Sequence, residues 1–476
     1  MKRLFNRVPL RAGVAAIGLG VLSGCASIDI GQSVKRINDE TSGFTQGNLS
    51  LATNDSEKTK LRGRAHSLLE KPLSQSQAVE LALVNSPSMQ ALLAQSWAEA
   101  AQTAQSGRIA NPVFSFERLR AGDELELGRA LSFGLLDLIS LPWRQSAASR
   151  RIEQAQVKLA ADVVDQVTLV RQAWVRAVAA QQTLKYAEQV YEASQASAEL
   201  AQRMQAVGNF NRVSRARQQA FYADAATRLA SASHLNTAAR EELVRLLGLN
   251  DAQVDQLRLP DRLPDLPKEP VNPKAFSAQA SQSRLDIRLA QSNFDAYAKA
   301  QGLELVSSFT DIELTARRNT KFDNAAGTSS SARGYELALR LPIFDWGGMQ
   351  RDAFNARTLA AANQLEAVTR SAGSNLRESY SAYRAAHDVA RHYRDEVLPL
   401  RKVISDENQL RYNGMLIGVF ELLADYRDQV ETVIAAIDAE QQFWLADAAM
   451  QASLIGRPTS TTLSVGGAAP SAGGGH

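Results

Sequence analysis

Four segments of the chain alternate apolar and polar residues, which is the period of a β-strand. The clearest of them covers 334–342, and its apolar positions are Tyr335, Leu337, Leu339 and Leu341. Successive side chains of a strand point to opposite faces, so this alternation predicts a strand with one apolar and one polar face. The same pattern predicts three more strands, over 111–120, 124–138 and 303–318.

Each predicted strand has about the length that a tilted strand needs to cross a bilayer, roughly 9–11 residues. The strand over 124–138 has one apolar face, interrupted by Arg129 and otherwise made of Leu125, Leu127, Leu131, Phe133 and Leu135. Its opposite face is polar, which suits a water-filled lumen. Aromatic residues lie on or beside the strand ends, where membrane proteins place an aromatic belt, namely Phe114, Phe116, Trp143, Phe344 and Trp346.

Four strands cannot close a barrel, and hydrocarbon does not tolerate an open strand edge. Either the strands form a small soluble sheet that packs on helices, or several chains combine their strands. Three chains would contribute twelve strands, enough for a closed barrel with an aqueous bore. Between the strands, 121–123 is a short turn, whereas the polar segment 318–333 is predicted to be a long external loop.

Most of the remaining chain reads as long helices, so the predicted fold class is mainly α. Residues 144–207 contain neither Gly nor Pro over 64 positions, which predicts a rod of about 95 Å. Residues 212–247 also lack both residue types. Rods of this length are stable only against one another, as in a coiled coil. In the second half of the chain, Gly373 and Pro399 predict a kink or a short break.

The two halves of the chain repeat one design. The segment 92–107 aligns with 288–302, and Gly208 aligns with Gly414. Ordered landmarks of this kind indicate a tandem duplication of one structural unit. Each unit is predicted to contain a helix, a strand pair, a very long helix, a turn and a return helix. The two repeats cover 73–256 and 274–456.

The segments outside the repeats have compositions of their own. Residues 1–24 have the basic and apolar regions of a signal peptide, and the LSGC motif at 22–25 resembles a bacterial lipobox. This motif predicts a lipid anchor on Cys25, the single cysteine; the alternative is an ordinary signal peptide that contains a cysteine. Residues 25–72 are polar and predicted to be a tether, 257–273 form a linker with five prolines, and 457–476 are predicted to be disordered.

Composition excludes several classes of function. The net charge of +3 is too small to indicate nucleic-acid binding. No apolar run reaches the roughly 20 residues of a transmembrane helix. No P-loop, GxSxG, HExxH or CxxC motif is present, so neither an enzyme nor a cofactor is predicted. The histidines are scattered, which predicts helix-surface positions rather than a metal site.

Three segments and the lipobox resemble the TolC-like outer-membrane efflux family. The segments are 73–95, 339–351 and 410–425. The resemblance implies a homotrimer with a twelve-stranded transmembrane β-barrel in the outer membrane of a Gram-negative bacterium and an α-helical barrel forming a periplasmic tunnel. It also implies two protein partners, a periplasmic adaptor of the membrane fusion protein class and an inner-membrane pump, besides outer-membrane lipid.

The family resemblance places the narrowest part of the tunnel at the turns between long helices. Glycine is expected there because a tight helix reversal favours positive φ. Glu421 matches the acidic constriction of the family best, and Asp425 lies one helical turn further on; both acids could also be ordinary solvated residues. The residues predicted to form the turn tips or to contact the adaptor are Gly208, Asn209, Arg212, Arg215, Arg217 and Gly414.

The first turn departs from the family pattern because it carries several arginines where acids or small residues are frequent. These arginines could pair with Glu421 or Asp425 of a neighbouring chain, contact the adaptor, or be solvated. The predicted cargo is small toxic compounds, drugs or metal ions. Two alternative functions remain at this point: type I protein secretion within the family, and a lipid-anchored periplasmic coiled-coil adaptor or structural protein outside it.

Overall fold

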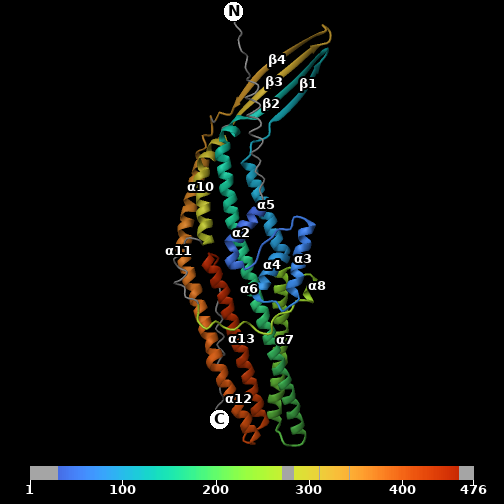
Figure 1. The fold of residues 1–476 in the computed structure, drawn as a ribbon, viewed down its shortest axis with the longest axis vertical. Coiled ribbons are helices and arrows are strands. Elements are labelled where there is room, and N and C mark those ends of the chain that lie inside the picture. The colour runs from blue at the N-terminus through green and yellow to red at the C-terminus, as the bar shows by residue number, and fades with distance from the viewer. Residues whose placement is uncertain (1–29, 271–283, 310, 342, 460–476) are drawn as a thin grey trace, which may run out of the picture.

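The computed structural model describes residues 30–270, 284–309, 311–341 and 343–459. Residues 1–29, which include the predicted signal peptide and Cys25, lie outside these ranges, as do residues 271–273 of the linker and residues 460–476. The predictions made for them stay predictions. Long helices run along the main axis, with the strands at one end and two helix turns at the other (Figure 1). None of the described helices combines the length and the apolar composition needed to span a membrane.

The two halves of the chain repeat the same order of elements. The first unit contains α5 (Pro87–Ser106), β1 (Val113–Ala121), β2 (Glu124–Gly134), α6 (Leu135–Ala206) and α7 (Arg212–Leu247). The second contains α10 (Leu285–Phe309), β3 (Ile312–Asp323), β4 (Thr328–Leu339), α11 (Gly348–His392), α12 (Leu398–Asn413) and α13 (Val419–Ile455). This order confirms the predicted duplication of one helix–strand-pair–helix unit.

Helix α6 begins earlier than the Gly- and Pro-free stretch suggested, because it includes Pro142. The strand predicted over 124–138 therefore ends at Gly134, and its last four residues are helical. Asp137 lies in the first turn, where a carboxylate interacts favourably with the helix dipole. It also accepts a 2.7 Å hydrogen bond from Arg144 Nη1, one of the contacts that stabilise a helical start.

The second unit interrupts its long helix. A π-helical turn, η1 (Tyr393–Val397), separates α11 from α12, and Pro399 lies just after it. Proline lacks the N–H that a regular helix would use here, which explains the break predicted at Pro399. Gly373 lies within α11, which is continuous from Gly348 to His392, so a break at Gly373 is excluded and a kink there stays a prediction.

The second strand pair is displaced from the predicted segments. Residues 303–309 belong to α10, and β3 continues to Asp323. The predicted loop over 318–333 is wrong, since only 324–327 separate β3 from β4. The polar composition of this segment suggested a loop. In the structure, however, β3 pairs with both β2 and β4 as far as its last residue, Asp323, which lies opposite Glu124 of β2 and Thr328 of β4. Backbone pairing to two neighbours therefore outweighs the low apolar content.

All four strands form one antiparallel sheet in the order β1-β2-β3-β4. The inner strands β2 and β3 come from different repeats and pair from Glu124↔Asp323 to Gly134↔Glu313. Strands β1 and β4 lie at the two edges, and each has its outer backbone groups unpaired within the described chain.

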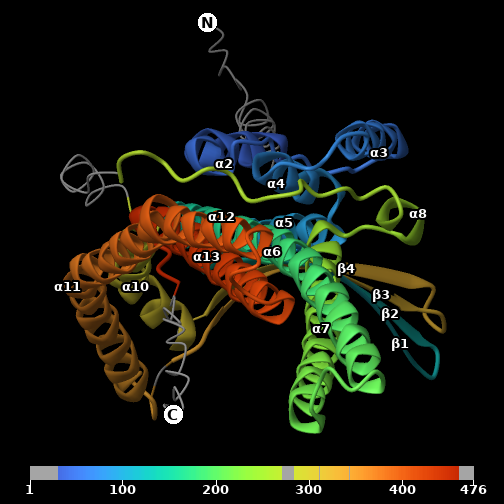
Figure 2. The ribbon, with the colours of Figure 1, turned by 90° about the horizontal axis from the view of Figure 1, so that it is seen from below.

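The segment predicted to be a polar tether contains two packed helices, α2 (Ile30–Thr45) and α3 (Asp55–Leu69). Together with α4 (Gln75–Asn85) they lie on one side of α6 (Figure 2). Helix α2 buries Val34, Ile37 and Phe44, which recur at helical spacing within a mostly polar sequence. A short apolar stripe is easily overlooked in such a composition.

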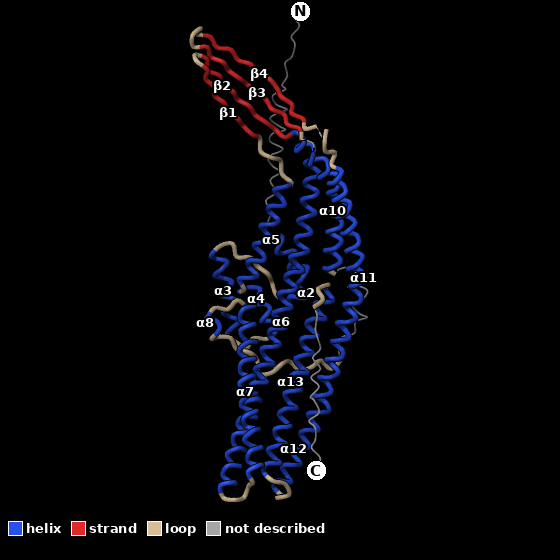
Figure 3. The backbone as a smooth tube through the Cα atoms, turned by 180° about the vertical axis from the view of Figure 1, so that it is seen from behind, coloured by secondary structure: helices blue, strands red, loops and turns tan. Residues whose placement is uncertain are grey.

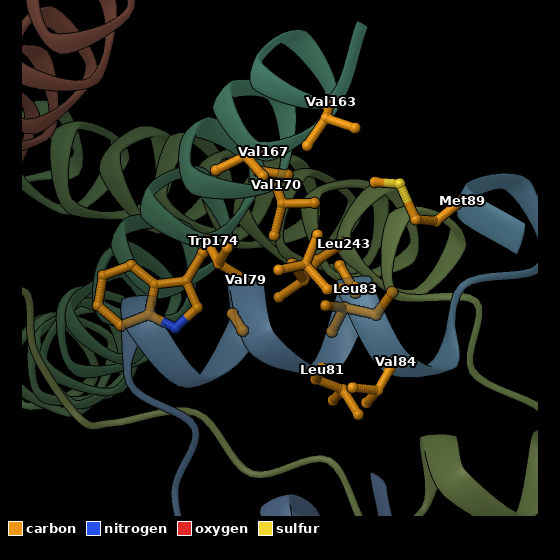
Figure 4. Packing of buried hydrophobic residues seen from close by; sticks show 14 of the residues in the cluster. Val79, Leu81, Leu83, Val84, Met89, Val163, Val167, Val170, Trp174 and Leu243 are labelled. Atoms are coloured by element: carbon orange, nitrogen blue, oxygen red, sulfur yellow. The ribbon is translucent and has the colours of Figure 1, made fainter. Parts of the chain in front are cut away.

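The main core joins these helices to the long antiparallel hairpin that α6 and α7 form. Val79 and Leu83 of α4 meet Val170 and Trp174 of α6 and Leu243 of α7 (Figure 4). The Trp174 side chain is 2% exposed, and its Nε1 donates a 2.8 Å hydrogen bond to the carbonyl oxygen of Leu73. Trp174 therefore fixes the entry of α4 onto α6.

The described part of the proline-rich linker, 257–270, crosses the helices as an extended strap after the short helix α8 (Asp251–Val254) (Figure 1). Its buried side chains are Leu257, Leu259, Leu263 and Leu266. Two ring nitrogens donate to its backbone: Trp444 Nε1 to Pro264 O at 3.1 Å and His387 Nε2 to Pro267 O at 3.1 Å. His387 is 1% exposed, so the surface position predicted for it is wrong.

The half-buried carboxyl group of Asp447 in α13 lies near Arg171, a strongly buried arginine of α6. Arg171 lies over the ring of Phe44 and donates to the Phe44 carbonyl oxygen and to Gln451 Oε1. Burial raises the pKa of Asp447 to about 6, against a smaller opposing effect of Arg171. The folded state thus holds this proton more tightly than the unfolded state.

This proton gives a testable pH dependence. Because the folded pKa of Asp447 is raised, its contribution to stability is full below pH 4 and is lost as the pH rises through about 6. We expect Asp447→Asn to remove on the order of 2–3 kcal/mol of the pH dependence of unfolding between pH 4 and 7. Urea unfolding at a series of pH values measures it. Asp224→Asn, the same substitution at an exposed position of α7, is the matched control. An unchanged profile in Asp447→Asn would contradict the assignment.

Candidate functional site

Two helix turns lie next to each other at the end of the molecule remote from the sheet (Figure 3). In the first, Gly208 has φ +82°, as predicted. In the second, Gly414 has φ −79°, and Met415 takes the left-handed conformation with φ +57°. The prediction of positive φ at Gly414 is therefore wrong by one residue.

Both turns end their first helix with the same hydrogen-bond pattern, a Schellman motif. The N–H of Asn209 donates to Met204 O, and the N–H of Leu416 donates to Arg411 O. The residue before each donor must be left-handed, which is Gly208 in one turn and Met415 in the other. Gly414 instead still donates to Leu410 O as a helical residue, which explains the offset.

A stacked aromatic pair joins the two turns. The rings of Phe210 and Phe420 have centroids 4.6 Å apart and planes 25° apart. Such a pair contributes about 0.5–1.5 kcal/mol beyond the area that it buries. This pair is not among the residues predicted from the sequence, although a phenylalanine beside each polar turn is a signal for it.

Helices α7 and α13 are also connected above the turns. The Arg427 guanidinium lies 3.9 Å from the ring centroid of Phe221, and burial lowers its pKa. One helical turn further along α13, Glu431 forms an ion pair with Arg228 of α7. Two cross-hairpin contacts and the Phe210–Phe420 stack therefore hold the two hairpins together within one chain.

The predicted constriction residues lie at this end, in the first two turns of α13. Glu421 is exposed, and Asp425 is half-buried with its Oδ2 lacking a hydrogen-bond partner within the described chain. In the described chain neither acid forms an ion pair with an arginine of the first turn. Arg215 donates instead to Gln205 Oε1 at 2.6 Å. The other predicted tip residues that precede or follow it are exposed, namely Gly208, Asn209, Arg212 and Arg217.

At the other end of the molecule, the sheet has two chemically different faces. The apolar face carries the side chains that share the register row Phe114↔Leu131↔Ala316↔Tyr335 and every second row from it. Phe114 is 66% exposed, Leu337 63% and Tyr335 86%. An exposed apolar surface of this continuity indicates an interface with lipid or protein.

The polar face carries charges that pair across strands. Arg317 of β3 lies 2.9 Å from Glu336 of β4, and Lys321 lies 2.7 Å from Glu124 of β2. Asn319 Nδ2 donates to Glu126 Oε1 at 2.9 Å. This face is therefore suited to water.

The residues predicted as an aromatic belt are all exposed. Phe114 and Phe116 lie on the apolar face of β1, two residues apart. Trp143 lies near the start of α6, directly after β2, whereas Phe344 and Trp346 follow β4 before α11 begins. Four of the five thus lie at the end of the sheet that joins the helices, with Phe116 further along β1.

The described residues contain no group of three or more His, Cys, Asp or Glu side chains placed to hold a metal ion. Comparisons with protein-family models and with curated protein sequences find no match. Comparison with solved structures does find matches, at low sequence identity and over most of the chain.

Three of the matching structures are described as outer-membrane proteins or channels. VceC from Vibrio cholerae is 16% identical with a TM-score of 0.62, over 81% of this chain and 96% of that chain. The CmeC channel of Campylobacter jejuni is 14% identical with a TM-score of 0.64, over 87% and 90%. The MtrE channel of Neisseria gonorrhoeae in its open state is 19% identical with a TM-score of 0.62, over 84% and 91%. The chain has a TolC-like outer-membrane channel fold. In this fold, each chain supplies long helices and four strands.

Proposed function

We propose that this chain is one subunit of a trimeric outer-membrane channel of a tripartite efflux system. In this proposal it receives small toxic compounds from an inner-membrane pump through a periplasmic adaptor and releases them outside the cell. The observation that carries the proposal is the sheet, which has one exposed apolar face and two unpaired edges in a single chain.

The unpaired edges require neighbouring chains if the sheet lies in a membrane. Each unsatisfied backbone group costs several kcal/mol in hydrocarbon, so only a closed barrel avoids the loss. Pairing β1 of one copy with β4 of the next is a head-to-tail contact, which closes into a ring. Three copies give twelve strands and a bore wider than side chains alone would fill.

The two faces of the sheet agree with this arrangement. The apolar face would lie against lipid and the ion-paired polar face against water in the lumen. The strands contain 9, 11, 12 and 12 residues, long enough for tilted strands to cross a bilayer.

The long helices also expose apolar side chains that a neighbouring copy would cover. They include Leu235 of α7, Leu359 of α11 and Leu400, Val403 and Leu410 of α12, all at least 59% exposed. Side-by-side packing of three hairpin pairs would bury them, as long helices require. The result would be a helical tunnel that continues the barrel.

The turn end of the hairpins is the proposed gate. Three copies of Glu421 and Asp425 would form acidic rings there, and the unpartnered Oδ2 of Asp425 would accept a hydrogen bond from a neighbouring chain. The arginines of the first turn are available for this contact or for the adaptor.

Loss of the Phe210–Phe420 stack tests the gate. We expect Phe420→Ala to loosen the two hairpins against each other by about 0.5–1.5 kcal/mol and so to raise the mean single-channel conductance and the open fraction in planar bilayers. Phe344→Ala, an exposed phenylalanine outside the helices, is the matched control. Equal conductance of Phe420→Ala and wild type would remove this contact from the gate.

Planar-bilayer recording of the purified wild-type protein tests the function itself. Discrete, cation- or anion-conducting steps support a channel. A current baseline without conductance steps at all protein concentrations would favour the alternative, a lipid-anchored coiled-coil protein. Such a protein needs no path across the membrane. Anchoring of the chain through a lipid on Cys25 is part of the same proposal.

A further inference from the structure

The sheet sorts its charged residues by face. The strand register places five arginines and no acidic residue on the apolar face, namely Arg118, Arg120, Arg129, Arg318 and Arg333. On the polar face, two basic residues, Arg317 and Lys321, accompany six acidic residues, namely Glu117, Glu124, Glu126, Glu313, Asp323 and Glu336. Alternation alone would not separate the charges so completely.

The five arginines form a band across the sheet, which we call the arginine band. Arg129, Arg318 and Arg333 lie directly opposite one another on three adjacent strands. Arg118 and Arg120 of β1 continue the band toward the turn that joins β1 to β2. On the helix side of the band, the apolar face is uncharged up to Ile312 and Leu339. The face is thus divided into an uncharged half and a cationic half.

The arginine band has no internal counter-charge. All five side chains are exposed. In the described chain none of them forms an ion pair, whereas Arg317 and Lys321 on the polar face both do. Neighbouring strands lie about 4.8 Å apart, and like charges placed directly opposite each other are destabilising. Such a row is stable when an external anion neutralises it.

We propose that the arginine band binds the phosphate groups of a membrane lipid whose head group carries two or more phosphates. The inference rests on the proposed function, because it requires the apolar face to lie against lipid. The acyl chains of the lipid would cover the uncharged half of the face, and its head group would reach the arginine band. The lipid would lie in the leaflet that surrounds the β1–β2 and β3–β4 turns. Guanidinium groups bind phosphate in a bidentate way, and a row about 10 Å wide matches more than one phosphate.

Charge-removing variants on the two faces test this site. The test variant is Arg129→Gln with Arg318→Gln and Arg333→Gln, and the control is Arg317→Gln with Lys321→Gln on the polar face. Titration of the detergent-solubilised protein with diphosphorylated lipid A, followed by native mass spectrometry, measures binding; phosphatidylcholine is the neutral comparison. Each arginine at an anionic surface contributes about fivefold, so we expect roughly hundredfold weaker binding in the test variant. The control should bind as wild type.

Several outcomes would overturn the inference. Equal binding by test variant and wild type would do so, as would equal weakening in the control, which would indicate unspecific attraction. If the test variant does not assemble, Arg318→Gln alone should still weaken binding about fivefold. Conductance in pure phosphatidylcholine bilayers separates the proposed channel function from the proposed lipid site. A protein that conducts in these bilayers but does not bind lipid A would refute only the lipid site. A change of ion selectivity in the test variant would place the arginines in the lumen and refute it as well.

Discussion

Replacing Leu337 with arginine is expected to prevent assembly of the protein in the membrane. Leu337 is 63% exposed in the single chain and lies on the uncharged half of the apolar face, opposite Leu314. An arginine on the lipid face of a barrel costs about 2–4 kcal/mol near the midplane of the bilayer. A trimer carries the substitution three times, so the cost multiplies.

The adjacent position provides a matched control. Ala338 lies on the polar face and pairs with Glu313, so Ala338→Arg adds the same side chain one residue away and gains an opposite charge across the strands. Assembly is measured as the amount of detergent-extracted trimer in the membrane fraction. We expect at least a tenfold loss for Leu337→Arg and near-wild-type amounts for Ala338→Arg. Equal losses, or none, would contradict the assignment of the two faces.

Truncating Trp174 is expected to give the largest loss of stability in the helical part. This side chain is 2% exposed and packs with Val79 and Leu243 of the main core. Trp→Ala substitutions in cores typically cost about 3–5 kcal/mol. The Leu73 carbonyl would also lose its hydrogen-bond donor, which costs about 1 kcal/mol more.

The midpoint of urea unfolding and the protease resistance of residues 30–69 report this loss. Because Trp174 anchors the start of α4, those residues should become cleavable in Trp174→Ala before the long hairpins do. Trp97→Ala serves as the control, since Trp97 is 39% exposed; its cost should be about 1 kcal/mol or less. Unchanged protease resistance in Trp174→Ala would show that the N-terminal helices are held by other contacts.

The sequence predicted the parts of the fold that have a local signal. Alternation identified β1, β2 and the second half of β4, where one face is apolar. The Gly- and Pro-free stretches identified α6 and α7, because an uninterrupted helix needs only their absence over many turns. The duplication identified the order of elements in the second unit, because its landmarks follow one another as they do in the first.

The structural features that the sequence did not predict depend on contacts between residues that lie far apart in the sequence. The ends of β3 and β4 are polar on both faces, so only their register with β2 distinguishes them from a loop. The alternating run over 303–309 fits a helix as well as a strand, and continuation of α10 decides between them. His387 is buried because a strap 120 residues earlier covers it.

The candidate site shows the same limits. The turn at Gly208 was predicted because glycine signals a left-handed residue, but Met415 takes that role in the second turn. The Phe210–Phe420 stack joins residues 210 positions apart, so a phenylalanine beside each polar turn is a signal for a contact but does not identify its partner. The arginine band depends on the register of four strands, which no single segment of the sequence indicates.

The most direct test of the proposed channel is the mass of the detergent-extracted protein, measured by light scattering and corrected for bound detergent. Two unpaired strand edges in each chain predict a mass of three chains, with β1 and β4 of neighbouring copies completing the barrel. A well-folded particle with the mass of one chain would contradict the account, because the sheet would then be stable with open edges and would not form a transmembrane barrel.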